Sequence, residues 1–344
     1  PPLALATDYP RPSVRTSHGD TLPVAFSREL SEAVLGFSRR ERVTPFMTVL
    51  AAFQELLRRY SGQEDFAVGT PTANRRQRKV EPLVGYFINV LVLRADLHGD
   101  PSFRELVQRV RSTSLEAYEK QDLTLDQITE AVQPERDLSR HPLFQVMLIL
   151  QNNPRPKVQL PDLEVVPLGS VEHARTAKFE LTMPLRVTPA GLVEGNLNFN
   201  TDLFARATVQ RMTAHYLMLL EDAMADPDRP LSSLPLLTAT ERRTVLSDWN
   251  VTARPLPEVV GVEQLFATHA AGTPQAEAVV DGDRRWTYGE LNESANRLAR
   301  YLQRCGVEPE TKVGICLERS ADFVLAVLAV LKAGGAYVPL DPTY

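Results

Sequence analysis

A change in residue composition after position 225 divides the sequence into two parts. Residues 1–225 carry apolar runs at helical and strand spacing, whereas residues 226–257 are rich in Pro, Asp, Arg and Thr. Beyond residue 257 the apolar runs return in an alternating strand and helix pattern. A chain of 344 residues is also longer than one hydrophobic core usually supports. We therefore predict two domains joined by a connector that packs on its neighbours.

The pattern before residue 226 predicts a mixed α/β domain. Thr44 followed by Pro45 is typical of a helix start, and apolar residues then recur at helical spacing until Gly62. Residues 66–70 and 84–93 predict two buried strands. Further helices are predicted at 27–40, from Ser102, where Glu105 completes a capping-box pattern, at 125–132 and at 209–225. Further strands are predicted at 144–150, 181–187 and 192–199, and the last two flank residues 188–191, which have a hairpin signature.

The pattern after residue 257 predicts strands that alternate with helices. Thr287 and Glu290 have the spacing of a capping box, and Gly334 with Gly335 predicts a left-handed helix end. A helix between two successive strands is the usual crossover connection of parallel strands, so we expect a parallel sheet. The predicted strands are 278–280, 312–317 and 336–340, and the predicted helices are 287–303 and 320–333.

Charge and composition exclude several classes of partner. The net charge of −5 gives no general attraction to nucleic acid or to an anionic membrane, and no apolar stretch reaches the roughly 20 residues that span a bilayer. Cys305 and Cys316 lack metal-ligand spacing and fit a reducing, cytoplasmic location. The proline-rich residues 1–26 are expected to run extended over another surface.

The residues give no complete catalytic centre. No G-x-S-x-G, P-loop or G-x-G-x-x-G pattern occurs. Histidines occur singly, without metal-ligand spacing, so each is predicted to be a surface or capping residue. The residues alone therefore predict two α/β units with an incomplete active site. The six histidines are His18, His98, His141, His173, His215 and His269.

Three stretches in the first part resemble signature motifs of condensation domains from nonribosomal peptide synthetases. Residues 85–94 are similar to G-x-F-V-N-T-x-x-x-R, with Val90 in place of the Thr. Residues 136–143 match R-D-x-S-R-x-P-L, and residues 120–125 resemble H-Q-D-x-P-F-E only in part, because the His, Pro and Phe are replaced. The residues that carry the likeness are Gly85, Phe87, Asn89, Arg94, Gln121, Asp122, Arg136, Asp137, Ser139, Arg140 and Pro142.

Two stretches in the second part resemble the opening motifs of adenylation domains in the same family. They are residues 287–292 and residues 331–341, of which the second matches nearly residue for residue. The matching residues include Tyr288, Glu290, Leu291, Lys332, Gly334, Tyr337, Pro339 and Asp341.

The resemblance implies a fold and a division of the chain. Residues 1–245 are expected to form the C-terminal lobe of a condensation domain, which is similar to chloramphenicol acetyltransferase. Residues 246–260 are expected to be a linker, and residues 261–344 the partial parallel-sheet start of an acyl-adenylating, AMP-binding domain. Epimerisation or acyltransferase lobes are alternatives within the fold, and a non-catalytic fragment that interacts with carrier proteins is an alternative from another class.

The resemblance also implies an activity for the whole enzyme. Condensation domains join acyl or peptidyl and aminoacyl thioesters, held on peptidyl carrier domains, by an amide bond. Adenylation domains activate an amino acid with ATP and magnesium, and the carriers bear phosphopantetheine. The condensation motif H-H-x-x-x-D-G is expected before residue 1, in the N-terminal lobe, and the adenylation phosphate loop after residue 344. We therefore assign no catalytic, cofactor-binding or metal-binding residue here and expect the chain to be inactive alone.

Roles for individual motif residues follow from the same resemblance. Asn89, expected at the end of a buried strand, either faces the substrate tunnel or makes a strand-end hydrogen bond. Arg136, Asp137 and Arg140 are expected to form a charge-assisted brace before the strand at 144–150. Tyr288 and Glu290 are expected to shape the start of a helix.

Overall fold

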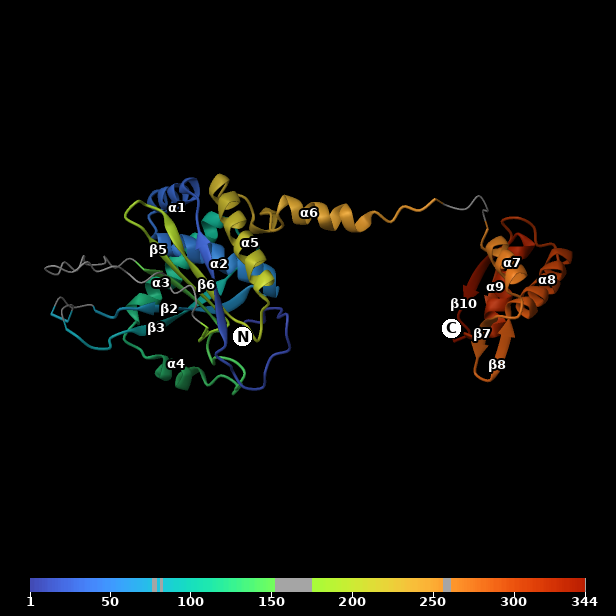
Figure 1. Ribbon diagram of the computed structural model, residues 1–344, viewed down its shortest axis with the longest axis horizontal. Helices are drawn as coiled ribbons and strands as arrows, with labels where there is room; N and C mark the ends of the chain where they lie inside the picture. The colour runs from blue at the N-terminus through green and yellow to red at the C-terminus, as the bar shows by residue number, and fades with distance from the viewer. Residues whose placement is uncertain (76–78, 81–82, 152–174, 256–260, 344) are drawn as a thin grey trace. The chain divides into compact units, whose positions relative to one another are not determined.

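A computed structural model describes residues 1–75, 79–80, 83–151, 175–255 and 261–343. The chain forms two compact units, Pro1–Asn250 and Val251–Tyr344, which we describe one at a time. Figure 1 shows the elements of both. Of the six histidines, His173 lies outside the described residues.

The first unit is built on a mixed six-stranded sheet with the order β1-β6-β5-β4-β2-β3. The pairs β2 with β4 and β4 with β5 are parallel, and the other pairs are antiparallel. The predicted hairpin of β5 and β6 is confirmed. The strands are β1 Gly19–Ala25, β2 Asp65–Thr72, β3 Asn89–Asp96, β4 Val146–Gln151, β5 Leu181–Val187 and β6 Val193–Asn200.

Helices cover this sheet, and α2 lies at their centre, in contact with α1, α3, α5 and β4 (Figure 1). The helices are α1 Arg28–Arg40, α2 Pro45–Ser61, α3 Phe103–Glu119, α4 Leu125–Val132, α5 Arg206–Ala225 and α6 Ala239–Leu246, with 3₁₀ turns η1 Leu231–Ser233 and η2 Asp248–Asn250.

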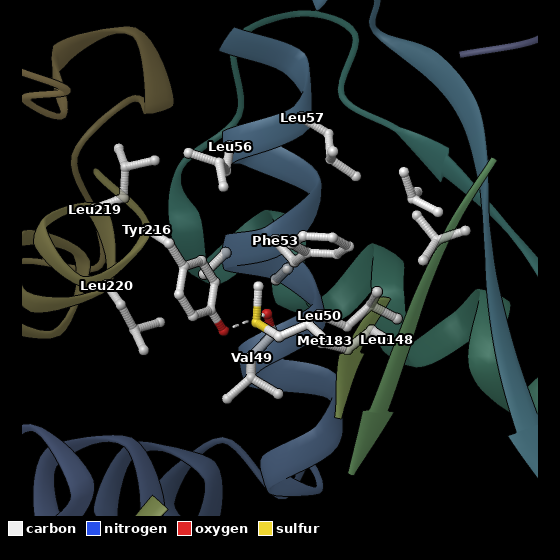
Figure 2. Close-up of a cluster of buried hydrophobic side chains, with 14 of the residues drawn as sticks. Val49, Leu50, Phe53, Leu56, Leu57, Leu148, Met183, Tyr216, Leu219 and Leu220 are labelled. Atoms are coloured by element: carbon white, nitrogen blue, oxygen red, sulfur yellow. Dashed lines mark hydrogen bonds between the residues drawn. The ribbon is translucent and has the colours of Figure 1, made fainter. Parts of the chain in front are cut away.

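The sequence of α2 explains its central place. Thr44 accepts a hydrogen bond from the Met47 amide, and Gly62 ends the helix with a φ of 70°. All residues from 46 to 57 are buried, so α2 contacts its neighbours around its whole circumference. Figure 2 shows α2 between α5 and the strands, with the Tyr216 hydroxyl donating to the Val49 carbonyl at 3.1 Å.

A close approach between β2 and the segment before β4 requires a glycine. A Cβ atom at Gly69 would collide with the ring of Phe144, which is fully buried. Glycine therefore lets the aromatic ring lie against the backbone of β2.

Two predictions for the first unit are wrong. The strand predicted at 84–93 begins only at Asn89. Its partner strand β2 ends at Thr72, which pairs with Asn89, so no backbone of β2 remains to pair with residues 84–88. Val84 and Tyr86 are fully or largely exposed. The segment at 1–26 belongs to this unit, since Leu3 is buried in its core and β1 joins its sheet. The helix α6 was not predicted.

The connector packs on the first unit only in its first half. Leu231 and Leu234 are buried, and their carbonyls accept hydrogen bonds from Arg59 at 2.6 and 3.0 Å. Helix α6 has no buried residue, and residues 251–255 are exposed. Residues 256–257 lie outside the described part.

The second unit contains two separate two-stranded sheets. Strands β9 and β10 are parallel and joined through α9, as predicted. Strand β7 is antiparallel to β8, however, because a short turn that includes Gly282 reverses the chain directly; the parallel pairing expected for 278–280 is wrong. The elements are α7 Val262–Gly272, β7 Glu277–Asp281, β8 Arg284–Thr287, α8 Tyr288–Arg304, β9 Lys312–Cys316, α9 Ala321–Ala333 and β10 Ala336–Leu340. Helix α7 and strand β8 were not predicted.

Candidate functional site

The residues of the condensation-type motifs fall at separate places in the first unit. Asn89 is the first residue of β3, so it lies at a strand end as expected, and it is half-buried. Its Nδ2 donates to the carbonyls of Gln121 and Leu123, both at 2.7 Å, and its Oδ1 accepts from the Val90 amide at 2.9 Å. The side chain therefore holds the loop between α3 and α4 against the sheet.

Two further motif residues belong to this loop. The Gln121 Oε1 accepts from the Thr72 hydroxyl at 3.1 Å, and its Nε2 donates to the Tyr118 carbonyl at 2.9 Å. Asp122 is exposed in the same loop. The sheet edge at Thr72 and Asn89 and the loop at 120–124 thus form one hydrogen-bonded cluster.

Arg94, Gly85 and Phe87 lie outside this cluster. Arg94, near the other end of β3, forms a two-bond ion pair with Asp65 at 2.8 and 2.7 Å. This hydrogen bonding lowers the pKa of Asp65, but Arg94 is exposed and the pair contributes little to stability. Gly85 is exposed, and the Arg75 guanidinium lies 4.3 Å from the Phe87 ring centroid.

The residues of the R-D-x-S-R-x-P-L motif form a turn before β4. The Asp137 carboxylate accepts from the Ser139 amide at 2.8 Å and lies 3.5 Å from Arg140 Nε. Hydrogen bonding to Ser139, with Arg140 nearby, lowers the pKa of Asp137. Arg140 also donates to the Leu3 carbonyl at 2.8 Å, which ties the turn to the N-terminal segment.

The brace expected in this motif is smaller than predicted. Arg136 is exposed and makes no ion pair with any described residue, because the oxygens of Asp137 are turned toward Ser139 and Arg140. Pro142, also exposed, follows the turn. The brace therefore consists of Asp137 and Arg140.

A buried histidine shows that one sequence prediction was too simple. His215 on α5 is buried, not a surface or capping residue. Its Nδ1 lies 2.7 Å from the Tyr60 hydroxyl and its Nε2 lies 2.9 Å from the Glu241 carboxylate on α6. Burial disfavours the charged form of Glu241, but hydrogen bonds from His215 and Thr238 outweigh it and lower the carboxyl pKa to about 2.

The first adenylation-type motif builds the start of α8. The capping box between Thr287 and Glu290 is confirmed. The ring of Tyr288 contacts Phe266 and His269, with centroids 5.6 and 4.6 Å apart. Leu291, the next motif residue, is buried in the small core between α8 and α9.

The second adenylation-type motif ends α9 and forms β10. Lys332 Nζ donates to Asn292 Oδ1 at 2.8 Å, which links α9 to α8. Gly334 ends α9 with a φ of 92°, as predicted from the glycine pair. Tyr337 and Pro339 are exposed in β10, and the carboxylate of Asp341, after the strand, accepts from the Thr343 amide and hydroxyl.

These motif residues therefore cap helices, fix turns and join elements. Within the described ranges, no group of three or more His, Cys, Asp or Glu side chains is placed to hold a metal ion. None of the helices in that part of the chain is long and apolar enough to cross a bilayer.

Comparison with protein families identifies the two units. The condensation domain family matches residues 1–246, and the AMP-binding enzyme family matches residues 266–344. The chain therefore belongs to the condensation domain family and continues into the start of an AMP-binding domain, the arrangement found in nonribosomal peptide synthetases.

Curated relatives share this arrangement along the whole chain. The chain is 46% identical over 344 residues to a linear gramicidin synthase of Brevibacillus parabrevis, and 43% identical over 342 residues to malpinin synthetase of Mortierella alpina. These matches cover 100% and 99% of this chain but only 4% of each relative. The chain thus spans a small part of the proteins it resembles.

Two solved structures have a fold similar to that of this chain. A holo four-domain nonribosomal peptide synthetase bound to AMP and glycine matches with a TM-score of 0.82 and 25% identity, over 99% of this chain and 27% of that chain. An X-domain from teicoplanin biosynthesis, solved in complex with OxyB, matches with a TM-score of 0.62 and 27% identity, over 69% of this chain and 52% of that chain. The predicted α/β fold class is confirmed.

Proposed function

We propose that residues 1–245 form the C-terminal lobe of a condensation domain that joins carrier-bound acyl or peptidyl and aminoacyl thioesters by an amide bond. Residues 246–260 then act as linker to an amino-acid adenylation domain that begins at 261–344. The observation that carries this proposal is the match to nonribosomal peptide synthetases along all 344 residues.

The proposed chemistry needs groups that this chain does not supply. General acid–base catalysis requires a positioned His or carboxylate with an orienting partner. The sequence contains no H-H-x-x-x-D-G motif, and the motif residues of the first unit use their polar atoms to fix loops and turns. We propose that the chain alone is inactive and supplies the scaffold of one wall of the condensation site.

The proposal also assigns cofactors and partners to the whole enzyme. They are ATP and magnesium for adenylation, and phosphopantetheine on the upstream and downstream carrier domains. A cytoplasmic location belongs to the same proposal. The motif residues Tyr288, Lys332 and Asp341 are proposed to act here as architecture of the adenylation unit, because they contact helices or cap turns.

One assay on three proteins tests the proposal. The 344-residue chain is compared with a longer protein in which the same residues follow a lobe that carries H-H-x-x-x-D-G. With carrier-bound thioesters as substrates, we expect amide product only from the longer protein. A longer protein with the second His of the motif changed to Ala serves as the control and should form no product. Amide formation by the 344-residue chain would refute its proposed inactivity, and no product from the longer protein would refute the condensation role.

A second candidate is a non-catalytic interaction role. The specific observation in its favour is the likeness to the X-domain that was solved in complex with OxyB. This candidate predicts that the longer protein binds a partner protein or a carrier domain but yields no amide. The same comparison therefore separates the two functions.

A further inference from the structure

The segment at residues 2–6 alternates exposed and buried side chains as a strand does, but it belongs to no strand of the described sheet. Leu3 and Leu5 are buried in the core of the first unit, whereas Pro2, Ala4 and Ala6 are exposed. The backbone polar atoms of this segment therefore find their partners outside the ladder of the sheet.

Two side chains bind both polar backbone atoms of Leu3. Its amide donates to Gln145 Oε1 at 2.7 Å, and its carbonyl accepts from Arg140 at 2.8 Å. Arg140 belongs to the R-D-x-S-R-x-P-L motif, and Gln145 follows that motif by two residues. The amide and carbonyl of one residue in an extended chain point to the same side, so both side chains lie along one edge of the segment.

A third side chain binds the opposite edge. Gln63 Oε1 accepts from the Ala4 amide at 2.7 Å, and Gln63 Nε2 donates to the Pro2 carbonyl at 3.1 Å. Residues 2–4 are thus held from both sides, as a strand inside a sheet is held by two neighbours. We call the three side chains of Gln63, Arg140 and Gln145 the residue-3 clamp.

The clamp side chains on the first edge are themselves held in place. Gln145 is buried, and its Nε2 donates to the His141 carbonyl at 2.8 Å, which fixes the orientation of its amide. The Arg140 Nε lies 3.5 Å from the Asp137 carboxylate. Such second contacts restrict the rotamers of the clamp, so it holds residues 2–4 in one geometry.

Burial of the segment does not by itself require the clamp. Leu3 is anchored by its own side chain, which is fully buried. Pro2 and Ala4 are exposed, so water could satisfy the backbone atoms that Gln63 binds. Bonds along both edges do more, because they fix the direction and the register in which the chain enters the unit.

We propose that Gln63, Arg140 and Gln145 are positioning residues for amide-bond formation. This inference rests on the proposed function, in which the lobe that carries H-H-x-x-x-D-G precedes residue 1. The clamp then holds the joint between the two lobes and fixes the catalytic groups of that lobe relative to this unit. Misplacement of reacting groups by about 1 Å can lower a rate about 100-fold, so a rigid joint supports kcat.

Kinetics of the longer protein described above test this role. Arg140→Met and Gln63→Met each remove the bonds of one clamp side chain, and kcat for amide formation should fall about tenfold or more, with unchanged KM for the carrier-bound substrates. Arg140→Lys keeps one charged hydrogen bond to the Leu3 carbonyl and should recover part of the loss. Arg136→Met is the matched control and should keep the parent kcat, because this exposed arginine of the same motif makes no ion pair with any described residue.

Two further measurements on the longer protein separate positioning from a loss of stability. In hydrogen exchange followed by mass spectrometry, amides of residues 3–6 should exchange about tenfold or more faster in Arg140→Met and Gln63→Met. Amides of residues 46–57 in α2 should not change, because that stretch is buried. Ser102→Ala removes the capping box of α3 at a similar cost in stability, yet it should keep the parent kcat.

The outcomes distinguish this inference from the proposed function. Unchanged kcat in both clamp variants overturns the positioning role, and so does an equal loss of kcat in Arg136→Met or Ser102→Ala. Unchanged exchange of residues 3–6 also overturns it, because the clamp would then not hold the segment. In each of these cases, amide formation by the parent protein leaves the proposed function standing. No amide from the parent protein refutes the proposed function and the positioning role together.

Discussion

The attachment of α6 to the first unit depends on one carboxylate. The Glu241 Oε2 accepts hydrogen bonds from His215 Nε2 at 2.9 Å and from the amide and hydroxyl of Thr238, both at 2.8 Å. Because α6 has no buried residue, little hydrophobic burial supports it. We therefore expect Glu241→Ala to release α6 while the rest of the unit stays folded.

The size of the effect follows from these contacts. Loss of the capping interaction costs about 1 kcal/mol, and loss of a hydrogen bond to a charged group costs about 1.5–3 kcal/mol. The Glu241 side chain is 26% exposed, so the lower part of the second range applies. The free energy of opening of α6 should fall by about 2–3 kcal/mol, which raises its opening constant roughly 30- to 150-fold.

Hydrogen exchange measured by mass spectrometry on the full chain follows this opening directly. Amides of residues 239–246 should exchange faster in Glu241→Ala, whereas those of α2 should not change, because α2 is buried on all sides. Glu241→Gln is the matched control: glutamine keeps the capping box but loses the charge, so its effect should be intermediate. Unchanged exchange of 239–246 in Glu241→Ala would refute the reasoning.

The pH dependence of the same contact has a defined sign. The folded-state pKa of Glu241, about 2, lies below its ordinary value of 4.5. The stabilisation of α6 is therefore complete above about pH 4.5 and is lost as the pH falls toward 2. Tyr60, the other neighbour of His215, has a pKa that burial raises to about 12 and stays neutral over this range. After correction for intrinsic exchange rates, Glu241→Gln should lose this dependence, and a dependence equal to that of the parent chain would contradict the assignment.

Two further substitutions test the first unit. Gly69→Ala should lower the free energy of unfolding by about 1–3 kcal/mol, because the added Cβ meets the Phe144 ring; urea unfolding monitored by circular dichroism measures this loss. Gly36→Ala is the control, since its Cβ meets only flexible arginine ends in α1, and it should cause no loss. Equal losses in the two variants would show that the collision at Gly69 is unimportant. Asn89→Ala removes two hydrogen bonds to the loop at 120–124, so the amides of that loop should exchange with solvent about tenfold or more faster. Protection equal to that of the parent chain would show that other contacts hold the loop.

Local features of the fold could be predicted from the sequence. The capping boxes at Ser102 and Thr287, the start of α2 at Pro45 and the left-handed glycine at Gly334 all appear where predicted. Each depends on residues within about one helical turn, so its interaction energy is present in any context that allows a helix. The hairpin of β5 and β6 is local for the same reason.

Contacts between distant residues could not be predicted. The strand predicted at 84–93 begins at Asn89 because its partner β2 ends at Thr72, and apolar pattern alone does not reveal where a partner strand ends. Arg140 donates a hydrogen bond to the Leu3 carbonyl, 137 positions away. No spacing rule joins residues so far apart in the sequence.

The sequence by itself determined the class of each unit and the start and end of most helices, since periodicity, capping and turn chemistry act over a few residues. Only the tertiary structure decided that β1 pairs with β6 and that His215 is buried between Tyr60 and Glu241. These features depend on which surfaces meet when the chain closes on itself. That choice follows from the burial of the whole core and is not present in any short stretch of residues.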